Sequence, residues 1–567
     1  MRTFTVSTLC LLLAFCAVTV LLAEKLLADD SVTEITGPLV EDGLIDFFKA
    51  FENFTYPPEF ATDENGFRIF LRTFGPAGPS ESFGDYYRQH AYEKLGLDPN
   101  TLPTLKYQHS PDSIILDYYT AKGEHYDSTR DGSVQFPWTL EQFPMLADWV
   151  KTKDEQLDAI AEMIRKPVFH PPLLPAPEWF EPESPKNIIS TILLPDYQLS
   201  RDIVRHFQAR AMYRVGRGDI DDAIGDKLLI PRLGRQIAFG GNLIPLLVGM
   251  AHEFTAAALP MDANPNSPLT KEHIQHIVAG LDALPPRIPT SLVYEAERLH
   301  TLSVVQDLAV AHTRRSLEFS RQLRDTTWLP VESVILLPGT FDWNSVYRRV
   351  NEIYDMADEP EKFQALYEAA HQRVVDGSLP DVARTFLTRD GLEMYVADYL
   401  FCYLSAGTGA AGQAVQRMEC ADNFQRLIWA IKMYELDHGG LPQSTMWPQD
   451  IAQYLCGDSS SEQFYSCFSC PSNPSPQGMT TYALVEYNGE VPEGHETIIL
   501  AELTIPVPLD QAFFTVDEVL ELSKKYRLRP QSSPHPGLMM TARRSGAVIA
   551  TPMNNEEDLL RLLGREQ

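Results

Sequence analysis

The hydrophobic pattern changes character several times along the chain. Residues 5–23 form an apolar run without charge, and a mixed segment after it ends in an amphipathic pattern from about Leu140 to Ile164, which predicts a helix. Beyond a proline-rich stretch, apolar side chains such as Val204 and Phe207 recur at helical spacing. These changes predict five parts: a signal or anchor helix 1–28, a mixed α/β segment 29–165, a linker 166–186, a helical domain 187–406 and an α+β domain 407–567.

The apolar run fits a membrane helix. It follows Arg2, precedes Glu24, and its length of about 19 residues is enough to cross the hydrocarbon core. No small-x-small cleavage site follows, because leucine stands at −3 in both LLA triplets, 21–23 and 26–28. We therefore expect an uncleaved anchor in the cell membrane with the bulk of the protein extracytoplasmic, or a secreted protein if the segment is cleaved.

The helical domain is predicted to consist of helix pairs. Turn sequences such as GRGD at 216–219 and ALPPRIP at 283–289 separate the apolar-periodic segments. Asp219, Asp221 and Asp222 cluster at one helix start, where the helix dipole favours negative charge. We interpret these aspartates as capping residues and not as metal ligands.

Three glycines follow the helical domain. Gly407, Gly409 and Gly412 match GxGxxG, whose glycines let a phosphate approach the start of a helix. The preceding segment, MYVADYLFCYLSA, has helical and not strand character, so the βαβ unit of a nucleotide site is missing. We expect a flexible joint at 407–415.

Composition and charge narrow the function classes. The 567 residues include 47 Lys and Arg against 77 Asp and Glu, a formal net charge of −30. This balance argues against a nucleic-acid partner, which is bound through clustered basic residues. With 44% hydrophobic and 22% charged residues, the chain is folded and acidic.

The cysteines are the main candidates for structural chemistry. Outside the cytoplasm disulfides are the default, and Cys467 and Cys470 form a CxxC pair. The proline-rich loop after this pair cannot supply the helix that activates a redox thiol. A zinc site would have to add Cys456 and either Cys420 or His438, without the second CxxC that makes such a site specific. We expect Cys456, Cys467 and Cys470 to be structural, chiefly in disulfides, with zinc as the alternative.

The histidines complete no known motif. His252–Glu253 begins like a zinc-protease helix, but alanine stands at 256 where the second histidine is needed. His273 and His276 share one face of a predicted surface helix with no third ligand in the sequence nearby. The sequence therefore predicts no catalytic, cofactor-binding or metal-binding residue and no cofactor.

Residues 420–567 carry a family resemblance. CADNFQRLIWAIKMYELDHGGLP ends in glycines and a proline and places four apolar side chains on one helical face: Phe424, Leu427, Ile428 and Ile431. FSCPSN, ETIILAEL, IPVPLD and SPHPGLMMTARRSGAVIA follow in order. This series resembles type II secretion pseudopilins and planctomycete-type envelope proteins with a pilin-like head, the domain of unknown function 1559. That family has a histidine, nine residues and Asp-Gly; here His535 is followed after nine residues by Ser545–Gly546, so glycine keeps the turn and the aspartate is lost.

The resemblance implies an α+β fold whose carboxyl-terminal head packs one helix on a small antiparallel sheet. It implies structural roles for His535 and Gly546, which would hold a loop and a hairpin turn. Together with the apolar run, it predicts a membrane-anchored, extracytoplasmic interaction or structural protein of the cell envelope with protein partners. The alternative is an extracytoplasmic hydrolase with dispersed carboxylates and histidines in the helical domain.

Overall fold

Every structural statement below refers to part of the chain. The computed structural model describes residues 37–39, 44–75, 84–98, 100, 120–121, 135–175, 192–193, 195–314, 341–356, 359–374, 389–404, 408–442, 446–455, 462–471, 476, 479–486, 497–515, 518–519 and 538–552. The expected anchor at 5–23, residues 176–186 of the predicted linker, Cys456 and His535 lie outside these ranges. Among the described helices, none is long and apolar enough to cross a membrane.

The amino-terminal part is mainly helical, with one short pair of strands. Its elements are α3 (Phe47–Thr55), α4 (Gly66–Phe74), α5 (Gly84–Lys94), α7 (Pro144–Ile164), β1 (Leu174–Pro175) and β2 (Ile192–Leu193). The amphipathic helix predicted to end at Ile164 is confirmed as α7, which has proline in its first turn, where the missing N–H is not needed. Asn65 caps α4, since its side chain accepts the N–H of Phe67 and donates to the carbonyl of His170.

Four helices form the middle of the molecule. They are α8 (Pro195–Arg217), α9 (Ile220–Ala238), α10 (Leu243–Ala257) and α11 (Lys271–Asp282). Asp219 is the N-cap of α9, with Asp221 and Asp222 in its first turn, so the predicted capping position of these aspartates is confirmed. Gly234 of α9 faces Gly249 of α10, and a Cβ on either would run into the backbone oxygen of the other. The two backbones therefore lie closer together than larger residues allow.

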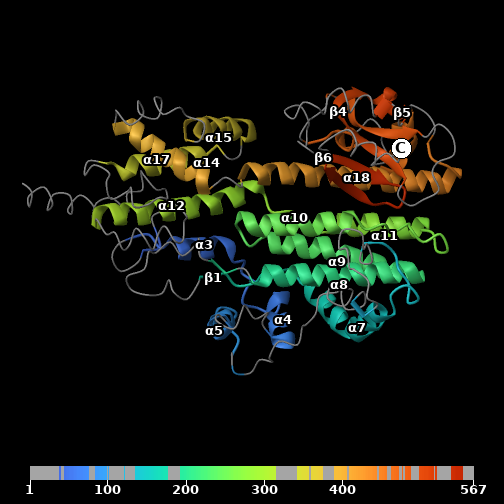
Figure 1. The fold of residues 1–567 in the computed structure, drawn as a ribbon, viewed down its shortest axis with the longest axis horizontal. Coiled ribbons are helices and arrows are strands. Elements are labelled where there is room, and N and C mark those ends of the chain that lie inside the picture. Colours follow the sequence, from blue (N-terminus) through green and yellow to red (C-terminus); the bar gives the residue numbers. More distant parts are fainter. Residues whose placement is uncertain are drawn as a thin grey trace, which may run out of the picture.

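Four further helices lie at the opposite end of the molecule from the sheet (Figure 1). They are α12 (Thr290–Arg314), α14 (Trp343–Tyr354), α15 (Pro360–Val374) and α17 (Arg389–Leu404). Together with α3 they bury a hydrophobic cluster of their own, which includes Trp343, Tyr347 and Phe401. A larger cluster joins α4 and α7–α11 to the carboxyl-terminal elements.

The carboxyl-terminal part combines a long helix with a sheet. Its elements are α18 (Thr408–His438), α19 (Trp447–Leu455), α20 (Glu462–Ser466), β3 (Met479–Glu486), β4 (Ile498–Pro508), the 3-10 turn η5 (Leu509–Gln511), β5 (Phe513–Thr515), β6 (Leu538–Arg543) and β7 (Val548–Pro552). The strand order is β5-β3-β4-β6-β7. All pairs are antiparallel except β5 with β3. The chain is therefore α+β, mainly helical with a small antiparallel sheet at its carboxyl end, as predicted.

The joint predicted at 407–415 is wrong for residues 408–415. Helix α18 begins at Thr408 and runs through Gly409 and Gly412 without a break. Ala411 and Ala414 are buried in the larger hydrophobic cluster, and tertiary packing of this kind outweighs the low helix propensity of two glycines.

Helix α18 lies between the middle helices and the sheet (Figure 1), in contact with α10 and α11 on one side and with β6 and β7 on the other. Phe424, Leu427, Ile428, Trp429 and Ile431 are all fully buried. Four of these positions form the predicted face, and Trp429 is buried as well because the helix is covered on more than one side.

Polar contacts fix the sheet on the middle helices at the turn between β6 and β7. The N–H of Asp262, in the loop after α10, donates to the carbonyl of Ser545 at 3.0 Å. Lys432 of α18 forms an ion pair with Asp262, and Glu435 of α18 forms one with Arg544. A further ion pair joins α18 to the middle helices, since Arg287 bridges Glu253 of α10 and Asp422 of α18.

Gly546 is expected to be needed for this docking. It has φ of +81°, and a Cβ there would run into the indole ring of Trp429. Gly546→Ala should therefore combine left-handed strain with overpacking and cost about 2–4 kcal/mol. Gly439→Ala is the matched control, because Gly439 has φ of +75° with nothing within 4 Å of a Cβ, and it should cost only about 1–2 kcal/mol. Thermal unfolding of both variants checks the order, and equal shifts of the melting temperature would contradict the packing argument.

Candidate functional site

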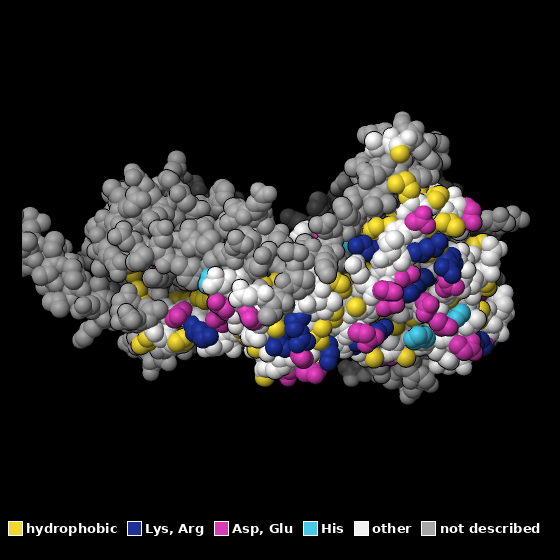
Figure 2. All heavy atoms as spheres, turned by 90° about the horizontal axis from the view of Figure 1, so that it is seen from below, with side chains coloured by type: hydrophobic (Ala, Val, Ile, Leu, Met, Phe, Trp, Pro, Cys, Tyr) yellow, Lys and Arg dark blue, Asp and Glu magenta, His cyan; other side chains and the backbone are white. Residues whose placement is uncertain are grey.

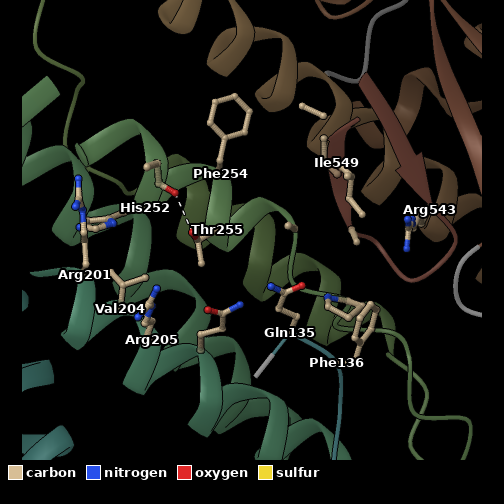
Figure 3. A pocket seen from close by; sticks show the side chains of 17 residues that line it. Gln135, Phe136, Arg201, Val204, Arg205, His252, Phe254, Thr255, Arg543 and Ile549 are labelled. Carbon is tan, nitrogen blue, oxygen red and sulfur yellow. Dashed lines mark hydrogen bonds between the residues drawn. The ribbon is translucent and has the colours of Figure 1, made fainter. Parts of the chain in front are cut away.

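A cavity of about 580 Å³ lies at the seam between the middle helices and the sheet. Its walls come from α8, α10, the turn between β6 and β7 with β7 itself, and the segment before α7 (Figure 3). Because the residues that line it come from parts of the chain far apart in sequence, the cavity exists only when the sheet is docked.

Three of the polar side chains that line the cavity are cationic. Arg201 and Arg205 project from α8, one turn apart, and Arg543 comes from the end of β6 (Figure 3). Of the described residues that line the cavity, none is Asp or Glu. Burial lowers the pKa of Arg543 from its ordinary value, and a guanidinium remains charged at neutral pH regardless. Among the described residues, the charged side chains that line the cavity are therefore all cations, although the chain as a whole is strongly acidic.

The remaining wall is largely apolar. Val204, Phe254, Pro260, Val548 and Ile549 line it. Arginine binds carboxylate or phosphate through planar, paired hydrogen bonds, whereas the apolar wall favours a hydrocarbon body. The arrangement suits a ligand with an acidic group next to an apolar surface.

A serine–histidine contact involves one residue of the cavity wall, His252. The Oγ of Ser200 lies 2.9 Å from Nε2 of His252, and both residues are buried. The Ser200 hydroxyl also lies 2.7 Å from the carbonyl of Tyr197, which can only accept its proton. His252 Nε2–H therefore donates to Ser200, which is the reverse of the direction that a general base needs.

The electrostatics of His252 agree with a structural role. Burial, and to a smaller extent the neighbouring Arg201 cation, lower its pKa to about 3. A histidine with this pKa is neutral at physiological pH and a weak acceptor of protons.

The residues predicted from sequence fall at different places. Gly546 forms the tight turn beside the cavity, whereas Cys456 and His535 are outside the described residues. Cys467 and Cys470 are buried, and they form no disulfide with each other or with Cys402 and Cys420. The disulfides expected of these residues are therefore not formed among the four described cysteines. Cys470 instead lies next to Cys420 and Glu502.

His273 and His276 do share a face of α11. Nε2 of His273 and Nδ1 of His276 lie 3.7 and 3.9 Å from the same carboxylate oxygen of Asp221. His273 also closes the capping box of α11 with Thr270. His273 therefore caps the start of α11, and both histidines lie beside the carboxylate of Asp221.

The sequence analysis missed the arginines of the cavity. Arg201 and Arg205 are four residues apart on a helix, which places them on one face, and this spacing was a usable signal. The sequence around Arg543 contains no comparable signal, because the position of Arg543 near α8 depends on how the sheet packs on the helices.

On the described part of the face seen in Figure 2, charges of the two signs are mixed. Lys and Arg side chains alternate there with Asp and Glu over the coloured, described part. Charges mixed in this way give no single-sign patch of the kind that attracts a polyanion.

Comparison of the chain with protein-family models, curated proteins and solved structures finds no match.

The buried state of His252 predicts a dependence of stability on pH. Its pKa is about 3 in the folded protein and about 6.5 when unfolded, so the unfolded state binds more protons between these values. Stability contributed by neutral His252 is present above about pH 6.5 and is lost as the pH falls toward 3.

His252→Gln should reduce the slope of stability against pH in this window by up to about 1.4 kcal/mol per pH unit. Denaturant unfolding between pH 7 and pH 4.5 measures the slope. His438→Gln removes an exposed histidine and should leave the slope unchanged. Equal slopes for wild type and His252→Gln would show that His252 is not held neutral by burial.

Proposed function

We propose that this protein is a membrane-anchored, extracytoplasmic interaction protein of the cell envelope, and that the seam cavity holds an acidic group of a protein partner. The cavity is the observation that carries the proposal. It sets Arg201, Arg205 and Arg543 around an apolar wall, which matches an acidic side chain or terminal carboxylate next to apolar residues.

The contacts that hold the seam together support a binding function more than a catalytic one. The turn between β6 and β7 is held by the Asp262–Ser545 hydrogen bond and by the ion pairs of Lys432 and Arg544. A wall fixed in this way presents its cations without reorganisation on binding, which lowers the cost of association.

The packing of the carboxyl-terminal part supports the proposal that residues 420–567 form a pilin-like head. Helix α18 packs along β6 and β7, the arrangement expected of the resemblance drawn from residues 420–567. We propose that this head serves in protein–protein assembly, and that the apolar run at 5–23 anchors the chain in the membrane.

The Ser200–His252 contact keeps an extracytoplasmic hydrolase as the second candidate. A serine oxygen 2.9 Å from a histidine nitrogen has the spacing of a nucleophile and its base. The burial of both residues and the lowered pKa of His252 favour the interaction protein.

A photo-crosslinking amino acid at Thr255, which is half-buried in the cavity wall, tests the proposal in intact cells of the source. We expect one protein to be captured reproducibly. Arg201→Glu should reduce its capture about tenfold or more, since a charge-assisted hydrogen bond is worth about 1.5–3 kcal/mol.

Lys151→Glu is the matched control, because Lys151 is exposed on α7 and does not line the cavity. It reverses the same charge and should leave capture unchanged. Equal loss in both variants would contradict the cavity as the binding site. Esterase activity of the purified protein toward p-nitrophenyl acetate that Ser200→Ala abolishes would support the hydrolase instead.

A further inference from the structure

Two thiols and a carboxylate converge inside the carboxyl-terminal part. Cys420 comes from α18, Cys470 from the loop after α20, and Glu502 from β4. One ligand atom from each, two Sγ and one carboxylate oxygen, lies within 4.8 Å of the other two. At most 1% of any of these residues is exposed. The cluster is therefore closed to solvent.

Neighbouring groups fix the three side chains in position. The backbone N–H of Cys470 donates to Oγ1 of Thr481 at 2.9 Å. The N–H of Met540 lies 3.4 Å from Oε2 of Glu502, while Oε1 lies 3.8 Å from Sγ of Cys420. The hydroxyl of Tyr482 lies 3.3 Å from the same Sγ. The carboxylate is thus oriented with one oxygen toward the backbone and the other toward the thiols.

This donor set matches one class of cation. Thiolates select soft or borderline metals, and zinc is bound by Cys sulfur at about 2.3 Å and by carboxylate oxygen at about 2.0–2.2 Å. Calcium and magnesium take oxygen ligands and do not fit two sulfurs. Tetrahedral coordination at these bond lengths sets ligand atoms about 3.5–3.8 Å apart, so the observed cluster needs only small adjustments to close around such an ion.

A bound cation would also explain why a carboxylate is buried beside two thiols. Glu502 is a carboxylate of which only 1% is exposed. A bound divalent ion would compensate the charge of this buried carboxylate and deprotonate the thiols that coordinate it. A disulfide between the two cysteines would leave the position of Glu502 without a role.

We propose that Cys420, Cys470 and Glu502 bind one thiophilic divalent cation of the zinc type. The Tyr482 hydroxyl, 3.3 Å from Sγ of Cys420, is a further oxygen atom beside the cluster. Binding releases the two thiol protons to solvent and forms two metal–sulfur bonds and one metal–oxygen bond. Because the site is closed, its role is structural: it ties α18, the CxxC loop and β4 together.

Cobalt(II), added to the full chain purified under reducing conditions and freed of metal, is the probe. Wild type should bind one equivalent and show a thiolate-to-cobalt charge-transfer band. Cys470→Ser should lose most of this band. Glu502→Gln retains both sulfurs and should keep the band at a weaker affinity. Cys402→Ser is the control, because Cys402 is a buried free thiol of the other hydrophobic cluster, and it should bind as wild type does.

The pH dependence of cobalt binding is a further test, and two results would contradict the proposal. Cobalt affinity should fall as the pH falls, because protons compete for the thiolates. Zinc should displace cobalt and abolish the band. A peptide containing a Cys420–Cys470 disulfide in protein isolated without reductant, found by mass spectrometry, would overturn the proposal. A wild-type band no stronger than that of Cys470→Ser would overturn it too.

Discussion

The burial of α18 on more than one side is the constraint on which the rest of the structure depends. A single helix supplies the surface on which both the middle helices and the sheet pack. Fully burying a large apolar side chain contributes about 1.5–3 kcal/mol, and Phe424, Leu427, Ile428, Trp429 and Ile431 are all fully buried. Neither partner layer can move without exposing part of this surface, so the seam between the layers is fixed.

The functional features follow from that seam. The turn between β6 and β7 meets α18 at Trp429 and the loop after α10 at Asp262, and this contact closes one wall of the cavity. Arg543 is thereby placed on the same cavity as Arg201 and Arg205 of α8. Next to β3 and β4, α18 contributes Cys420 to the thiol–carboxylate cluster. One helix thus positions both the proposed binding cavity and the proposed cation site.

The sequence predicted what depends on local pattern and missed what depends on packing between distant segments. The end of α7 at Ile164 and the apolar face of α18 followed from periodicity. The joint at the glycines of residues 408–415 was wrong, because burial of Ala411 and Ala414 outweighs local propensity. Glu502 carried a signal that was not used, because it is the one carboxylate within the apolar stretch IILAELTIPVP. Its meeting with Cys420 depends on how the sheet lies on the helix.

Hydrogen exchange tests the central claim most directly, that the seam cavity is where a partner binds. Exchange would be compared by mass spectrometry between the purified full chain and the same chain in its native envelope fraction. The account predicts slower exchange in the envelope fraction at both walls of the cavity, in α8 and in β6–β7, with little change in α14 and α15 at the other end of the molecule. Protection confined to α12–α17, with α8 and β6–β7 unchanged, would contradict it.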